Sequence, residues 1–195
     1  MTVTVSVTLP QFRTDARPLL EAAGTAERLG MAGVFIFDHL VPVGSPHRPV
    51  LEGAVSLGAV AAATSAMKVG TLVMRATLRP PEVTAGVAAT AAAVASGRTV
   101  IGLGAGDRLS ESEAERFGLE LTDPAGRVQR LGETLRAVRR AIPGVEVWVG
   151  GRSQAVREMA ADLADGWNAW GAAPEQFASE TAEVRARADR PITVS

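Results

Sequence analysis

Segments with the pattern of β-strands and segments with the pattern of α-helices alternate along almost the whole chain of 195 residues. The strand-like segments are short and rich in Val, Ile and Thr, whereas the helix-like segments repeat apolar residues at helical spacing. We expect strands over residues 2–9, 33–37, 68–73, 99–103, 145–149, 166–170 and 191–195. We expect helices over residues 15–29, 51–66, 80–96, 127–141, 153–164 and 174–188.

Repeated strand–helix units predict parallel strands joined by right-handed crossovers. About seven such strands indicate an α/β fold of the (β/α)8 TIM-barrel type, and the length suits a single domain over residues 1–195. The sequence stops on its last predicted strand, whereas a complete barrel typically takes about 250 residues. We therefore expect a barrel that is incomplete at its carboxyl end, with the eighth strand missing and one sheet edge left open.

Composition narrows the possible functions. The chain is 47% hydrophobic and 21% charged, with a formal net charge of -1, so it lacks the excess of Lys and Arg that a nucleic-acid binder needs. It contains no cysteine, which excludes disulfides and Cys-ligated metals, and we expect no metal site. No stretch predicts a membrane span and the amino terminus does not resemble a signal peptide, so the expected location is the cytoplasm.

The strand predicted at 33–37 is followed directly by Asp38 and His39, and His39 is one of only two histidines in the chain. Parallel α/β folds place their chemistry at the carboxyl ends of strands, and histidine titrates closest to neutral pH. We interpret His39 as a general acid/base or a polar contact to a cofactor ring, with Asp38 setting its orientation. The alternative is a half-buried histidine that is hydrogen-bonded to a neighbouring loop.

A glycine-rich segment follows the strand at 99–103. Gly102, Gly104 and Gly106 alternate with other residues and lead into Asp107. Glycine lets the backbone approach a ligand closely, so Gly104 and Gly106 are candidate cofactor contacts. Asp107 could exchange a proton with a substrate, and the alternative is that it caps a helix beginning near residue 110.

A second glycine-rich segment joins the strand at 145–149 to the next helix. It consists of Gly150, Gly151, Arg152 and Ser153. Free N–H groups at a helix amino terminus, together with a cation and a hydroxyl, favour a phosphate site. The alternative is a glycine turn followed by an ordinary serine cap.

Two tryptophans and two arginines complete the set of candidate residues. We expect Trp148 to pack in the barrel core, whereas Trp170, at a strand end, could line a cofactor pocket. Arg75 and Arg79 follow the strand at 68–73. We interpret both as solvated loop arginines, with an anion contact as the alternative.

Taken together, these segments resemble the bacterial luciferase-like superfamily of (β/α)-barrel flavin and deazaflavin oxidoreductases. The matching stretches are residues 35–39, 69–73, 96–98 with 101–107, 148–151 and 164–168. They occur in the family's order and at its approximate spacing over essentially the whole chain. The resemblance is closest to the branch that uses the deazaflavin coenzyme F420.

The resemblance implies a redox cofactor lying across the carboxyl mouth of the barrel. In the F420 branch the residue that matches His39 sits beside the cofactor ring and takes part in proton transfer, and Asp107 matches a proton donor. The third strand of family members ends in a non-proline cis peptide bond that backs the ring, which would fall near Leu72 and Val73.

The resemblance also assigns roles to the phosphate segment and to two helices. Gly150 and Gly151 match glycines that contact the cofactor phosphate. Dimerisation commonly uses the helices that flank the third strand, here the Ala-rich helices at 51–66 and 82–96, so a homodimer is expected. Family members usually carry an insertion before the fifth strand, where this chain has only Pro143 and Gly144.

The function that the sequence predicts is an F420-dependent oxidoreductase. It would transfer a hydride between the cofactor and a small organic substrate, with His39 or Asp107 moving the proton. An FMN-dependent monooxygenase is one alternative. A shortened flavin-binding protein without catalytic activity is the other.

Overall fold

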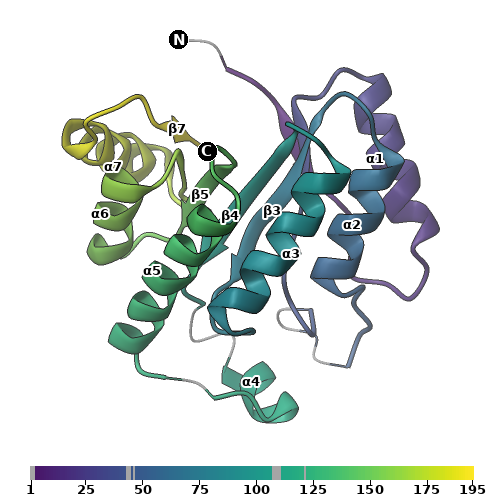
Figure 1. Ribbon diagram of the computed structural model, residues 1–195, viewed down its shortest axis with the longest axis horizontal. Helices are drawn as coiled ribbons and strands as arrows, with labels where there is room; N and C mark the ends of the chain where they lie inside the picture. Colours follow the sequence, from purple (N-terminus) through teal and green to yellow (C-terminus); the bar gives the residue numbers. More distant parts are fainter. Residues whose placement is uncertain (1–2, 43–44, 46, 107–110, 121) are drawn as a thin grey trace.

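The computed structural model describes residues 3–42, 45, 47–106, 111–120 and 122–195. Its strands form one parallel sheet whose spatial order follows the sequence (Figure 1). The strands are β1 (Ser6–Thr8), β2 (Gly33–Ile36), β3 (Lys68–Arg75), β4 (Thr99–Gly104), β5 (Glu146–Gly150), β6 (Gly166–Asn168) and β7 (Thr193–Val194). The predicted TIM-barrel-like α/β class with seven parallel strands is therefore confirmed.

Helices follow the strands and cover the outer face of the curled sheet (Figure 1). They are α1 (Arg17–Arg28), α2 (Gly53–Ala63), α3 (Pro81–Val94), α4 (Glu111–Phe117), α5 (Pro124–Ala141), α6 (Gln154–Leu163) and α7 (Pro174–Arg187). Over the described ranges, none of these helices is both long enough and apolar enough to cross a membrane.

α5 and α4 differ from the sequence expectation, and α2 is shorter than expected, at Gly53–Ala63. α5 begins earlier than predicted, because Asp123 caps it by accepting a hydrogen bond from Gly126 N at 2.8 Å and Pro124 occupies its first turn. A helix in the position of α4 was expected only under the alternative interpretation of Asp107, in which Asp107 caps a helix that begins near residue 110. It lies apart from the layer of helices that covers the sheet (Figure 1).

The two faces of the sheet bury different side chains. On the outer face, strand residues pack with helix residues such as Leu19, Leu57 and Leu131 in one large core. On the inner face, Phe35, Val100 and Trp148 form a small separate cluster. The prediction that Trp148 packs in the barrel core is confirmed, and its side chain is 7% exposed.

β1 and β7 form the two edges of this sheet, since each pairs with only one neighbour in the described part of the chain. β1 pairs with β2 over three residues, and β7 pairs with β6 over two. The sheet is therefore an open part of a barrel, as expected. Its carboxyl ends all point to the same side, where the site lies.

Candidate active site

The carboxyl ends of the strands surround a pocket of about 650 Å³. Aromatic and aliphatic side chains form much of its wall. Polar groups lie at two ends, one with His39 and Arg75 and the other with Arg152 and Ser153. The predicted site residues that line it are His39, Leu72, Val73, Gly104, Gly106, Gly150, Gly151, Arg152, Ser153 and Trp170. Asp38 is not part of this wall, and Asp107 lies outside the described residues.

The end of β3 has an irregular backbone. The peptide bond between Leu72 and Val73 is cis, at the place that the family resemblance implies. The register between β3 and β4 shifts between Thr71 and Met74. Both residues of the cis bond line the pocket, so this irregularity shapes its wall.

Two of the predicted glycine contacts have a packing explanation. A Cβ at position 104 would lie 2.4 Å from Val73 Cγ2, and a Cβ at position 150 would lie 2.6 Å from Val73 Cγ1. Carbon atoms in contact are normally about 3.5–4.0 Å apart. Gly104 and Gly150 are therefore required by the Val73 side chain, whether or not a ligand also approaches them.

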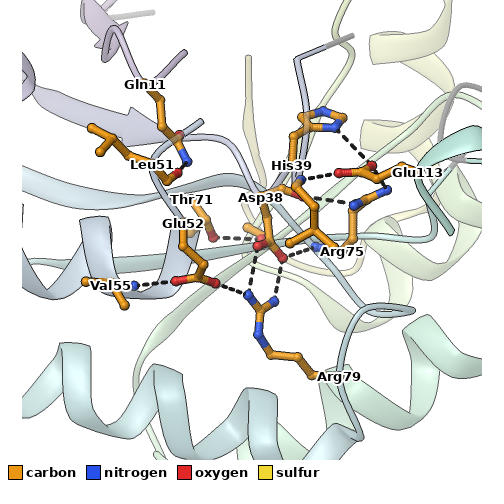
Figure 2. A network of polar contacts seen from close by, with 12 residues as sticks. Gln11, Asp38, His39, Leu51, Glu52, Val55, Thr71, Arg75, Arg79 and Glu113 are labelled. Atoms are coloured by element: carbon orange, nitrogen blue, oxygen red, sulfur yellow. Dashed lines mark hydrogen bonds and ion pairs between the residues drawn. The ribbon is translucent and has the colours of Figure 1, made fainter. Parts of the chain in front are cut away.

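Asp38 is buried in an ion pair and does not orient His39, contrary to expectation (Figure 2). Its carboxylate accepts hydrogen bonds from Arg79 Nη1 at 2.7 Å and Nη2 at 3.0 Å, and from Arg75 N at 3.0 Å. Arg79 also pairs with Glu52 at 2.5 Å. Asp38 thus ties the end of β2 to the end of β3. Its carboxylate accepts its hydrogen bonds from the two arginines and not from His39.

Arg75 and Arg79 are not solvated loop arginines, so that interpretation was wrong. The Arg75 side chain is 6% exposed and the Arg79 side chain 15% exposed. Burial opposes the charge of Arg79, yet the hydrogen bonds and negative charges of Asp38 and Glu52 raise its pKa. Both arginines are held by carboxylates that come from other elements.

Glu113 of α4 is the acidic residue that approaches His39 (Figure 2). Its Oε2 lies 2.6 Å from Arg75 Nη1 and 3.7 Å from His39 Nδ1, which is ion-pair range but longer than a hydrogen bond. Its Oε1 accepts hydrogen bonds from Leu40 N and from Val41 N, the latter at 3.0 Å. One carboxylate therefore fixes α4, the loop after β2 and the end of β3.

The surroundings lower the pKa of Glu113 from 4.5 to about 2. Burial alone would raise this pKa, but the interaction with His39, the charge of Arg75 and the two backbone N–H groups outweigh it. Glu113 is therefore ionised at neutral pH. A carboxylate on the Nδ1 side of an imidazole leaves Nε2 as the nitrogen that exchanges protons.

Arg75 has one unused donor. Its Nε donates to Asp38 O at 3.0 Å and its Nη1 pairs with Glu113, but its buried Nη2 has no partner among the described residues. Buried donors without a partner are uncommon in folded proteins. Because Arg75 also lines the pocket, this donor is an observation that favours a polar ligand atom nearby.

The opposite end of the pocket is formed by the start of α6. Arg152 is held by Glu180 of α7 through two hydrogen bonds of 3.0 Å, and these bonds raise the pKa of Arg152. Ser153 occupies the N-cap position as predicted, but its side chain makes no capping hydrogen bond. The first N–H groups of a helix lack intrahelical partners, so this end retains donors for an anion.

Trp170 is one of the residues that line the pocket, and it lies at the rim. It follows β6 instead of ending it, because β6 stops at Asn168. Its side chain is 78% exposed, which is unusual for so large an apolar group. An exposed aromatic at a pocket rim favours a role in contacting a ligand.

Residues 2–147 match the sequence model of the luciferase-like monooxygenase family. The chain belongs to this family. It is 35% identical over 135 residues to an F420-dependent glucose-6-phosphate dehydrogenase of Microbacterium testaceum, covering 69% of this chain and 38% of that protein. A relative with the same name from Beutenbergia cavernae is 32% identical over 143 residues, covering 73% and 42%. The chain thus spans about two fifths of the length of these relatives.

Solved structures show the same fold at low sequence identity. An F420-dependent secondary alcohol dehydrogenase in complex with an F420–acetone adduct has a TM-score of 0.84 and 19% identity, over 97% of this chain and 66% of that chain. The F420-dependent tetrahydromethanopterin reductase of Methanopyrus kandleri has a TM-score of 0.76 and 18% identity, over 100% and 65%. The family model and the curated relatives confirm the family membership that the sequence stretches predicted, and these structures confirm the fold.

The sequence pattern did not single out Glu113, nor did it place Phe12, Phe37 and Arg127 in the pocket wall. The signal for Glu113 was weak, because three glutamates occur in α4 at alternate positions. Only Glu113 is buried, whereas Glu111 and Glu115 are exposed. Which of them faces the site depends on how α4 docks, and this is a property of the tertiary structure.

Proposed function

We propose that residues 1–195 form a single cytoplasmic domain that acts as an F420-dependent oxidoreductase on a small organic substrate. The observation that carries this proposal is the position of His39, which lines the pocket with the ionised Glu113 carboxylate 3.7 Å from its Nδ1. The names of the curated relatives support the choice of cofactor. The family fold supports a site at this end of the sheet.

The pocket residues fit a deazaflavin. A planar ring system needs an apolar wall, which Leu72 and Val73 supply, and the unused Nη2 of Arg75 offers a donor to polar ligand atoms. The amino terminus of α6 suits the phosphate of the cofactor tail. The residues that would hold the cofactor are Leu72, Val73, Arg75, Gly104, Gly106, Gly150, Gly151, Arg152, Ser153 and Trp170.

When bound, the deazaflavin supplies a carbon centre that accepts or donates a hydride. His39 carries out the proton step, because its imidazole can take a proton from a substrate hydroxyl and return it in the reverse direction. Glu113 holds the Nδ1 side of the ring, so the exchange takes place at Nε2. Asp107 remains a second proposed proton donor and lies outside the described residues.

The first test is a titration of the protein with F420 and, separately, with FMN, followed by fluorescence. We expect tight binding of F420 alone, and we expect His39→Ala to bind it equally well but to lose turnover. Preference for FMN would indicate the monooxygenase, and binding without any turnover would indicate a flavin-binding protein. Binding of neither cofactor would refute the proposal.

We further propose a homodimer formed through α2 and α3, where the family resemblance locates the subunit contact. Val55 of α2 and Val83 of α3 are 74% and 51% exposed, on helices built largely of small residues. Light scattering should give twice the chain mass of 20.2 kDa. Val55→Glu should shift the protein to monomer, whereas Val3→Glu, at a valine that is 79% exposed in the segment before β1, should not.

A further inference from the structure

Arg152 lines the pocket at the start of α6, and a glutamate of the neighbouring helix α7 balances its charge (Figure 1). Glu180 accepts hydrogen bonds from Arg152 Nε and Nη2, both at 3.0 Å, and its side chain is 10% exposed. Glu180 is not itself part of the pocket wall. A carboxylate held this close offsets much of the positive potential that Arg152 alone would present to a ligand.

A second arginine of α6 is neutralised in the same way. Arg157 Nη2 donates a hydrogen bond to Glu183 at 3.0 Å, and Arg157 Nη1 lies 3.7 Å from Glu180. Arg152 and Arg157 thus face two glutamates of α7, and these four side chains together carry no net charge. The start of α6 therefore attracts an anion through its free N–H groups and the helix dipole, without surplus charge from its own arginines.

Arg127 of α5 supplies a further positive charge at this end of the pocket. α5 and α6 each join one parallel strand to the next, so they run in the same direction, and a Cβ at Gly132 would lie 3.4 Å from Met159 Cε. Five residues before this contact, α5 carries Arg127 and α6 begins at position 154, so Arg127 is level with the start of α6. Arg127 lines the pocket and is 9% exposed. Its Nη1 donates to Thr122 O at 3.0 Å, and no carboxylate among the described residues pairs with it.

We propose that Glu180 selects the cofactor, because it keeps the charge at this end of the pocket suited to a phosphodiester and not to a phosphomonoester. This inference rests on the proposed function. Three arginines against two glutamates leave a single positive charge among the described residues, that of Arg127. F420 carries a phosphodiester with one negative charge, whereas the phosphomonoester of FMN carries about 1.5 to 2 near pH 7. The extra charge of FMN would enter the pocket without a partner, which is costly.

A binding experiment without turnover tests this role of Glu180. The dissociation constant of F420 is measured by fluorescence, and those of FMN and riboflavin by their displacement of F420. Glu180→Gln removes the charge that balances Arg152, so the affinity for FMN relative to F420 should rise about tenfold, equivalent to about 1.4 kcal/mol. Riboflavin has no phosphate, and its affinity should stay the same. Glu183→Gln is the matched control on α7, because Glu183 is 61% exposed and pairs with Arg157 but not with Arg152.

A second variant keeps the inference testable if Glu180→Gln does not fold. Arg127→Gln should weaken F420 about tenfold and leave the affinity for the same deazaflavin without its phosphate and tail unchanged. An unchanged ratio of FMN to F420 affinity in folded Glu180→Gln, or an equal rise in Glu183→Gln, would overturn the inference and leave the proposed function standing. Equal weakening of both deazaflavins by Arg127→Gln would also overturn it. Failure of the unchanged chain to bind F420 would overturn the proposed function itself.

Discussion

The Oε2 of Glu113 and the Nη1 of Arg75 lie 2.6 Å apart, with both side chains almost fully withdrawn from solvent. The two residues come from α4 and from the end of β3. Because the same carboxylate also reaches the loop that carries His39, this pair connects the shape of the pocket to the group proposed to move protons.

Replacing Glu113 by Gln should destabilise the protein and change its chemistry. Removing one partner of a buried ion pair costs about 3 kcal/mol or more, because the other charge remains buried. The loss of the carboxylate beside His39 should also lower kcat/KM. Urea unfolding and steady-state kinetics measure the two effects, and Glu115→Gln, an exposed neighbour on α4, should show neither.

The stability that Glu113 contributes should depend on pH. Its pKa is lower in the folded chain, at about 2, than the value of 4.5 expected when it is unfolded. The contribution is therefore complete above about pH 4.5 and is lost as the pH falls toward 2, and it amounts to roughly 3 kcal/mol. The difference in unfolding free energy between the unchanged chain and Glu113→Gln should shrink over this range. A constant difference from pH 6 to pH 2 would contradict the assignment.

Asp38→Asn should separate structural effects from catalytic ones. We expect a loss of about 3 kcal/mol in unfolding stability, because Arg79 and the Arg75 N–H lose a buried anionic partner. The kcat of the folded variant should be retained, since Asp38 contacts arginines and not His39. A kcat lowered as far as in Glu113→Gln would show that Asp38 acts on His39 after all.

Gly150→Ala tests the packing around the cis bond. The new Cβ would lie 2.6 Å from Val73 Cγ1, and such overpacking should lower the unfolding free energy by about 2 kcal/mol. Combining it with Val73→Ala should recover part of this loss in a double-mutant cycle. Gly24→Ala is the control, because a Cβ at this position in α1 meets only Arg28 Nη1 at 3.5 Å, an ordinary van der Waals contact. It should stabilise the chain by about 0.5–1 kcal/mol, as expected when Ala replaces Gly inside a helix.

The fold could be predicted from the sequence because its signals are local. Parallel strands that are buried on both faces appear as short apolar runs, and the helices between them have their own spacing and caps. The position of His39 followed from the same rule, since it comes directly after such a run. The cis bond at Leu72–Val73 was expected only through the family resemblance, because nothing in those two residues marks it.

The polar network could not be predicted because its partners are distant in sequence. Asp38 was assigned to its neighbour His39, but its carboxylate is taken by Arg79, and Arg75 is taken by Glu113. Local patterns show that an arginine follows a strand, but not which carboxylate folds against it. Local patterns also could not predict that Phe12 stacks on Phe37. These two residues meet only when β1 and β2 lie side by side.

The shared carboxylate of Glu113 has a consequence for redesign of the pocket. None of the described residues of α4 lines the pocket, yet substitutions that move Glu113 would alter the support of the loop after β2 and of Arg75, which does line it. The Glu113 side chain thus affects both the shape of the pocket and the position of His39, so substrate specificity and proton transfer do not vary independently. Libraries that keep Glu113 and vary the exposed positions of α4 should yield active variants more often than libraries that randomise the whole helix.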